Sequence, residues 1–144
     1  MDTIYVREIR VNYKGRKKIS EKLTKGSEVA SVFRKLMPDN SREHFLALYL
    51  SAANEVIAYR VVSTGCATAA PVHCREVFQP ALLCGAITLI VGHNHPGGTA
   101  LPSKADKDVT VRLREAGNLL GIKLLDHLII GGDDYYSFCE MGDL

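Results

Sequence analysis

The chain has 144 residues, of which 47% are hydrophobic and 24% are charged, and its formal net charge is +2. This length is enough for one globular domain with a hydrophobic core, expected over residues 1–144, and too short for two. The longest apolar run, 81–91, is shorter than the roughly 20 residues that cross a bilayer, so no membrane segment is expected.

Two features of the sequence predict a cytoplasmic protein. The first ten residues, MDTIYVREIR, contain neither the apolar core nor the cleavage site of a signal peptide. The cysteines form no C-x-x-C pair and no zinc-finger spacing, which favours free thiols in a reducing compartment over disulfides or a cysteine zinc site. These cysteines are Cys66, Cys74, Cys84 and Cys139.

Charge is spread unevenly along the chain. Residues 1–26 contain eight Lys or Arg and three Asp or Glu, whereas residues 126–144 contain five acidic residues and no Lys or Arg. The basic segment could contact nucleic acid or another acidic surface. The alternative, which we favour, is a solvated hairpin tip around Gly15. The basic residues that flank Gly15 are Lys14, Arg16, Lys17 and Lys18.

The first predicted elements are a strand, a helix and a hairpin. Apolar residues between Ile4 and Val11 indicate an opening strand, and helical spacing from the expected N-cap Ser27 continues to Met37, before Pro38. Two strand-like runs then indicate a hairpin around an Ala-Ala-Asn turn. These runs cover residues 43–51 and 55–64.

The second half of the chain alternates helices and strands. A helix that Gly85 ends is followed by a buried strand, a helix between the N-cap Ser103 and Gly121, and two closing strands. In chain order these elements cover residues 74–84, 86–92, 104–120, 122–131 and 135–138.

The order of elements, β-α-β-β-α-β-α-β-β, predicts an α/β or α+β protein with a mixed sheet flanked by helices. The core is expected over roughly residues 27–139, after a basic N-terminal strand segment at 1–26. No internal repeat or low-complexity segment divides the chain.

The predicted strand 86–92 leads into two histidines one residue apart. Side chains at i and i+2 of an extended segment share a face, so His93 and His95 can bind one ion while Asn94 points away. Zinc takes three or four N, O or S ligands, so a further ligand must come from elsewhere. Asp106 is the nearest candidate, because the intervening loop, with two Gly and two Pro, could fold back to bring it close.

Other interpretations of these residues stay open. Ser103-x-x-Asp106 resembles a capping box, and either histidine alone would suit a polar loop. Residues 93–95 spell H-N-H, but the residues of the HNH nuclease motif are dispersed along the chain and are not adjacent. A zinc deaminase requires H-x-E and a later P-C-x-x-C, which this sequence lacks. The ligand types also allow a two-histidine, one-carboxylate iron site, although such oxygenases usually have all-β folds.

The spacing His93-x-His95, seven residues, Ser103, two residues and Asp106 resembles the JAMM signature H-x-H-x7-S-x2-D of the JAB/MPN metallopeptidase domain. The chain resembles the bacterial RadC family over roughly residues 41–138. Full-length RadC proteins begin with a helix-hairpin-helix region that has no room here, so we expect a short member with a JAB/MPN-like, cytidine-deaminase-like fold. The matching blocks are REHFLALYL, VHCREVF, HNHPGGTALPSKADKDVT and LGIKLLDHLIIG.

The resemblance implies a role for each signature residue. His93, His95 and Asp106 would bind zinc, with water as the fourth ligand. Glu43, in its E-x-F-x-x-L setting, would be the general base of catalysis. Ser103 would donate a hydrogen bond to the oxyanion of the tetrahedral state.

Glu43 has alternative interpretations, and two positions of the chain differ from the usual RadC pattern. Glu43 could instead be a solvated acid at a strand edge, and Glu55 and Glu76 compete with it for the role of base. Gly97 replaces the usual serine of RadC proteins, giving HPGG for HPSG, which could loosen the loop or remove a hydroxyl near the site. Cys74 stands where proline is usual.

The pair Asp126-His127 also belongs to the RadC pattern. It could contact the ligands of the site or position the substrate, or it could satisfy neighbouring polar groups within a strand, which we favour.

Two functions are consistent with this sequence. The first is a zinc-dependent metallopeptidase or amide hydrolase that acts on a peptide or isopeptide bond, with no organic cofactor. The alternative is a non-catalytic JAB/MPN binding module associated with DNA repair or DNA-bound partners, with a weak contact to DNA through the basic N-terminal segment. The sequence identifies neither the substrate nor the oligomeric state, and a homo-oligomer is one option.

Overall fold

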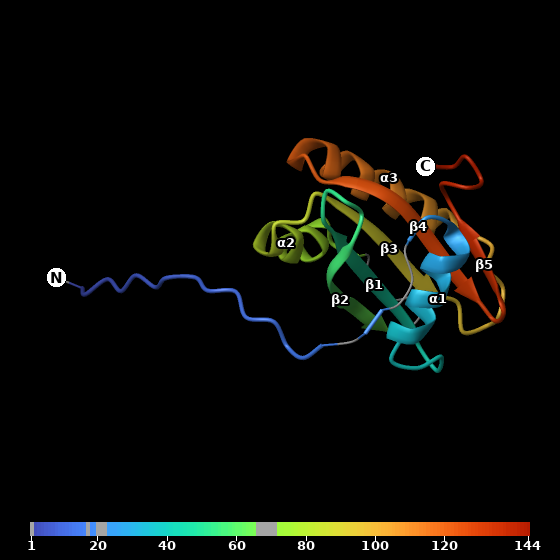
Figure 1. Ribbon diagram of the computed structural model, residues 1–144, viewed down its shortest axis with the longest axis horizontal. Helices are drawn as coiled ribbons and strands as arrows, with labels where there is room; N and C mark the ends of the chain where they lie inside the picture. The colour runs from blue at the N-terminus through green and yellow to red at the C-terminus, as the bar shows by residue number, and fades with distance from the viewer. Residues whose placement is uncertain (1, 17, 20–22, 66–71) are drawn as a thin grey trace.

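The structure of the chain is a computed structural model that describes residues 2–16, 18–19, 23–65 and 72–144 (Figure 1). Within these residues the chain forms one five-stranded sheet and three helices. The strands are β1 (Glu43–Leu50), β2 (Val56–Gly65), β3 (Thr88–Asn94), β4 (Lys123–Gly131) and β5 (Asp134–Ser137). The helices are α1 (Gly26–Leu36), α2 (Cys74–Cys84) and α3 (Lys104–Leu120).

The sheet has the order β2-β1-β3-β4-β5 and mixes both strand directions. β1 is antiparallel to β2 and to β3, β3 and β4 are parallel, and β5 closes the sheet antiparallel to β4. A parallel pair requires a crossover connection, which α3 provides between β3 and β4. The predicted mixed sheet flanked by helices is therefore confirmed, and α3 begins at the end of the sheet where β3 stops.

Helices cover both faces of the sheet, with α1 on one face and α2 and α3 on the other (Figure 1). Successive side chains of a strand point to opposite faces, so the central strand β1 contributes to two hydrophobic cores. Each of these side chains is at most 5% exposed. Phe45, Ala47 and Tyr49 pack toward α2 and α3, and Leu46, Leu48 and Leu50 pack toward α1.

α1 approaches β3 most closely at Gly92. A Cβ atom at this position would lie 2.8 Å from the Phe33 ring, so the ring has room only because residue 92 is glycine. Phe33 is fully buried. The helix therefore supports the strand from behind at the residue that precedes His93.

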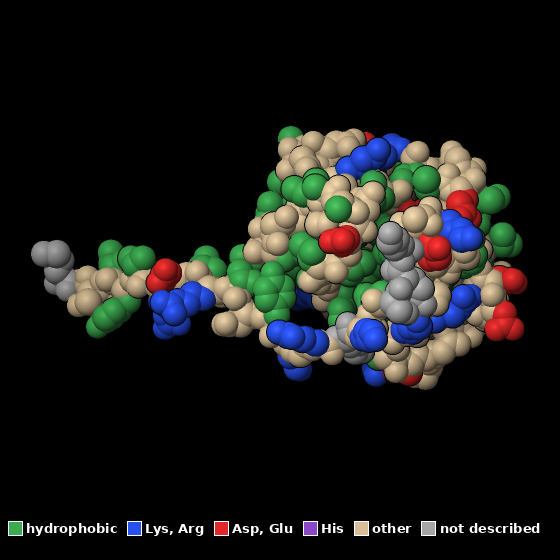
Figure 2. Space-filling model, in the orientation of Figure 1, with side chains coloured by type: hydrophobic (Ala, Val, Ile, Leu, Met, Phe, Trp, Pro, Cys, Tyr) green, Lys and Arg blue, Asp and Glu red, His purple; other side chains and the backbone are tan. Residues whose placement is uncertain are grey.

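The predicted strand between Ile4 and Val11 is wrong. Residues 2–16 form neither a strand nor a hairpin, and their apolar side chains lie exposed on an arm that extends away from the sheet (Figures 1 and 2). A strand is stable only when it pairs and buries one face, and no described strand pairs with this segment.

The predicted N-cap Ser27 is also wrong, because α1 begins at Gly26 and its N-cap is Lys25. The Gly26 N–H donates to Glu140 Oε1 at 2.9 Å, and the Lys25 N–H donates to the Glu28 carboxylate at 3.2 Å. Two acidic side chains therefore accept from the N–H groups of the N-cap and of the first helical residue, where the sequence suggested a hydroxyl acceptor.

The other predicted elements agree with the structure to within two residues at each end. Cys74, Cys84 and Cys139 are free thiols, as expected, and Cys66 lies outside the described residues. Within the described chain, no helix combines the length and the apolar character needed to cross a bilayer.

Candidate metal centre

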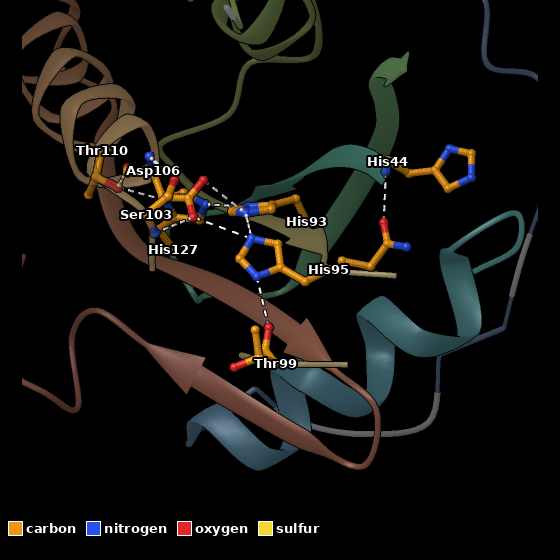
Figure 3. Close-up of polar contacts among 9 residues, drawn as sticks. His44, His93, His95, Thr99, Ser103, Asp106, Thr110 and His127 are labelled. Carbon is orange, nitrogen blue, oxygen red and sulfur yellow. Dashed lines mark hydrogen bonds and ion pairs between the residues drawn. The ribbon is translucent and has the colours of Figure 1, made fainter. Parts of the chain in front are cut away.

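His93 lies at the carboxyl end of β3, and His95 directly follows the strand on the same side (Figure 3). Asn94, between them, turns the other way: its side-chain oxygen accepts from the His44 N–H at 2.7 Å, and its amide donates to Arg42 O at 2.9 Å. The predicted alternation is confirmed. The amide of Asn94 ties the end of β3 to the start of β1.

Asp106 reaches the histidines from the first turn of α3. Ser103 is the N-cap of this helix, and its Oγ accepts from the Asp106 N–H at 3.1 Å. The Ser103 N–H in turn donates to Asp106 Oδ2 at 2.8 Å. The capping box that the sequence offered as an alternative is therefore present, and it holds the carboxylate in place beside the histidines.

The three side chains converge on one point (Figure 3). Asp106 Oδ1 lies 3.1 Å from His93 Nε2, Asp106 Oδ2 lies 3.3 Å from His95 Nε2, and the two Nε2 atoms are 3.0 Å apart. Tetrahedral zinc with bonds of about 2.0–2.1 Å separates its ligand atoms by about 3.3 Å. His93, His95 and Asp106 thus form a cluster that could hold a metal ion.

A backbone hydrogen bond fixes one proton of His95. Its Nδ1 lies 2.8 Å from Thr99 O, and because a carbonyl oxygen only accepts, Nδ1 carries the proton. The hydrogen bond with Asp106 raises the pKa of His95 against the opposing effect of burial. Burial alone would raise the pKa of Asp106, but the His93 and His95 imidazoles beside its carboxylate hold it well below its usual range. The cluster therefore favours positive charge, either a proton or a metal cation.

The loop that carries Thr99 lies against the end of β4. A Cβ atom at Gly131 would lie 2.5 Å from Ala100 N and from Thr99 C, so this approach requires glycine. The His95 N–H also donates to Ile130 O at 2.8 Å. The end of β4 thus positions the carbonyl that orients the His95 ring.

His127, on β4, contacts the other nitrogen of His93. Its Nε2 lies 2.9 Å from His93 Nδ1, and its Nδ1 lies 2.6 Å from Thr110 Oγ1. The ring is fully buried, and burial lowers the pKa of His127 well below its usual value, which keeps the ring neutral. The neighbouring Asp126 instead accepts from the backbone N–H groups of His127 and Cys139. His127 therefore contacts a residue of the cluster, and Asp126 satisfies neighbouring polar groups; the substrate-positioning role stays a prediction.

Glu43 opens β1, beside β3. Phe45 pairs with His93 in this antiparallel register, and two further residues along β1 bring Glu43 next to His95. In agreement, the negative charge of Glu43 contributes to the raised pKa of His95, after the larger effect of Asp106. The structure therefore brings Glu43 to the border of the cluster.

Of the other positions that the sequence singled out, Glu55, Glu76 and Cys74 lie in parts of the chain that carry no residue of the cluster. Glu76 is in the first turn of α2, as its helix pattern predicted, and Glu55 follows the far end of β1, at the hairpin. Cys74 opens α2. Gly97 lies in the loop after His95, with no atom within 4 Å of the place where a Cβ would stand.

Sequence reasoning missed two residues that contact the cluster. Thr110 follows Asp106 by four residues, which places both on one face of α3, so helical spacing was an available signal. Thr99 acts through its backbone carbonyl, so its residue type carries no signal.

Comparison with known proteins identifies one family and several relatives of this chain. Residues 23–143 match the family model of the RadC-like JAB domain. UPF0758 proteins from Chlorobaculum parvum and Staphylococcus haemolyticus are 40% and 42% identical over 85% and 84% of this chain. A UPF0758 protein from Geobacillus thermodenitrificans is 49% identical over 71% of it. The chain spans about half the length of these curated relatives, with 55%, 53% and 45% of their residues covered.

Proposed function

This chain belongs to the RadC-like JAB domain family, and on that premise we propose that it is a zinc-dependent amide hydrolase acting on a peptide or isopeptide bond. The observation that carries the proposal is the convergence of His93, His95 and Asp106 within distances of 3.0–3.3 Å. Two imidazoles and a carboxylate are donors that zinc accepts, and three protein ligands leave one tetrahedral position for catalysis.

Glu43 is the proposed general base. When bound, zinc would lower the pKa of a water molecule in its open position and polarise the scissile carbonyl. Glu43 would take a proton from the attacking water and pass it to the leaving amine. Its position beside His95 supports this role, because the base must lie at the edge of the metal site.

Ser103 is the proposed oxyanion donor. Its Oγ already accepts the Asp106 N–H, so its own hydroxyl proton is free to be donated elsewhere. The side chain is exposed at the start of α3, where a substrate could reach it. Removing one such donor typically lowers kcat by about 10²–10³.

Metal analysis combined with a cleavage screen tests this function. Untagged protein is expected to contain about one zinc per chain, and His95→Ala should lose it because only two ligands remain. Glu43→Gln should keep the zinc and lose turnover in a screen of peptides and isopeptides. Full zinc occupancy in His95→Ala would refute the ligand assignment, and full activity in Glu43→Gln would remove Glu43 as the base.

Contact with nucleic acid through the basic arm, the described residues 2–16 and 18, is a second candidate function. The observation that favours it is that Lys14, Arg16 and Lys18 are exposed on a segment without helix or strand, and Figure 2 shows basic side chains along it. Phosphate contacts release counterions, so affinity for duplex DNA should fall steeply with salt. Arg16→Ala with Lys18→Ala should reduce that salt dependence, and affinity that is insensitive to salt would exclude this function.

A further inference from the structure

His127 is hydrogen-bonded through both ring nitrogens although it belongs to no predicted ligand set. The Nε2 atom faces His93 Nδ1 at 2.9 Å, and the Nδ1 atom faces Thr110 Oγ1 at 2.6 Å. The Phe138 ring stacks on the imidazole with centroids 4.8 Å apart and an interplanar angle of 7°. Packing therefore fixes the plane of the ring, and its two hydrogen bonds have defined directions (Figure 3).

Thr110 determines which atom donates in each of the hydrogen bonds that link Thr110, His127 and His93. Its hydroxyl carries one proton, which is donated to Asp106 O at 2.7 Å. Thr110 Oγ1 must then accept from His127 Nδ1–H. In a neutral imidazole the other nitrogen is an acceptor, so His127 Nε2 accepts from His93 Nδ1–H. His93 is left with its lone pair on Nε2, the atom that faces Asp106 and His95.

A local irregularity of β4 makes this contact geometrically feasible. Leu124 and His127 both face the side of the sheet that α3 covers, although residues three apart on a regular strand point to opposite faces. The pairing of β4 with β3 shifts at this point, leaving Leu125 as an extra residue. Such a bulge reverses the alternation and turns His127 toward His93.

We propose that His127 and Thr110 are positioning residues that hold His93 in the Nδ1–H tautomer and so reserve its Nε2 for the metal ion. The inference rests on the metal site of the proposed function. His95 reaches the same tautomer by another route, since the backbone carbonyl of Thr99 can only accept. The His93 tautomer, by contrast, depends on two side chains and can be changed by mutation.

Zinc affinity, measured by competition with a chelating dye, tests the positioning role. His127→Leu removes the acceptor and should weaken zinc binding about 10–100-fold, the usual effect of losing a partner of a ligand histidine. His127→Gln keeps an amide oxygen that can accept from His93, and should retain affinity within about threefold of the unsubstituted protein.

A second pair of variants tests which nitrogen of His127 and of His93 carries the proton. Thr110→Val lets His127 place its proton on Nε2, which moves the His93 proton to the metal-facing nitrogen, so affinity should fall about tenfold. Thr110→Ser keeps the hydroxyl and should bind normally. Thr88→Val is the matched control, because the buried Thr88 Oγ1 has no hydrogen-bond partner in the described part of the chain.

Long-range ¹H–¹⁵N NMR of the histidine rings supplies a direct readout. The metal-free protein should show His93 with its proton on Nδ1, and Thr110→Val should show a population with the proton on Nε2. Unchanged zinc affinity in both His127→Leu and Thr110→Val would overturn the inference, as would equal losses in Thr110→Val and Thr110→Ser. If His127→Leu does not fold, the Thr110 pair decides. An unsubstituted protein that binds no zinc would instead refute the proposed function.

Discussion

Two buried histidines of this fold each face an aspartate, yet they differ in what surrounds them. His44 Nε2 lies 3.3 Å from Asp39 Oδ1, and His93 Nε2 lies 3.1 Å from Asp106 Oδ1. Both imidazoles are at most 2% exposed. Distance and histidine burial alone would therefore not distinguish the two His–Asp pairs.

The difference lies in the groups beyond each pair. The ring of His44 points away from the cluster (Figure 3), its Nδ1 meets the Thr64 hydroxyl at 2.8 Å, and Asp39 is 43% exposed. Around His93, a second imidazole and a less exposed carboxylate face the same point. Convergence of three lone-pair atoms, rather than burial with one acid, is what qualifies a site for a metal ion.

Exchanging each histidine for alanine tests this contrast most strongly. His93→Ala should lower zinc affinity by more than about 100-fold, since even indirect changes around a ligand cost about 10–100-fold. His44→Ala should keep zinc affinity and instead lower the free energy of unfolding. Isothermal titration with zinc and urea unfolding of the metal-free proteins measure the two effects. Equal zinc affinities in both variants would remove the distinction.

Gly131→Ala sharpens the comparison by moving only one side of the cluster. The added Cβ would meet the backbone of Thr99 and Ala100 at 2.5 Å, so the backbone there must shift, and we expect the Thr99 carbonyl to move away from His95. We expect zinc affinity to fall and the free energy of unfolding to drop by about 1–3 kcal/mol, as overpacking usually costs. Gly97→Ala is the control, since its Cβ would meet no atom within 4 Å. If Gly131→Ala matches the control in both measurements, the loop does not orient His95.

The pH dependence of zinc binding is the third test. Asp106 raises the pKa of His95, so this ring holds a second proton below that pKa and loses it above. Zinc requires the bare nitrogen, and its affinity should therefore rise with pH until the His95 pKa is passed, by about tenfold per pH unit for one displaced proton. Zinc titrations between pH 5 and 8 measure the slope. A flat profile would show that His95 is not a ligand.

Restoring the serine that is usual in RadC proteins should have the smallest effect. The space around Gly97 is open, so Gly97→Ser adds a hydroxyl without a clash. Zinc affinity should stay within about twofold, because a Cβ at this position meets no atom within 4 Å and surface changes of this kind usually alter stability by less than about 0.5 kcal/mol. A change of tenfold or more would show that position 97 acts on the metal site.

Most of the fold could be predicted because local signals and tertiary structure agree. Three local signals predicted element ends to within two residues: the helical spacing, the glycines after two helices (Gly85 and Gly121), and the apolar run at 86–92. The prediction failed between Ile4 and Val11, since a strand needs a partner that a local pattern does not name. It also failed at Ser27, because Glu140, far along the chain, satisfies the start of α1.

The sequence by itself determined the donor types of the candidate site and their spacing. His93 and His95 alternate with Asn94 on an extended segment, and Ser103 and Asp106 share one helical turn, so both arrangements follow from local geometry. Only the tertiary structure decided which distant groups orient them. The bulge in β4 turns His127 toward His93, and Gly131 lets the loop of Thr99 come close to β4. Both contacts depend on how β3, β4 and α3 pack together. Such contacts join residues far apart in the chain, and no local pattern encodes them.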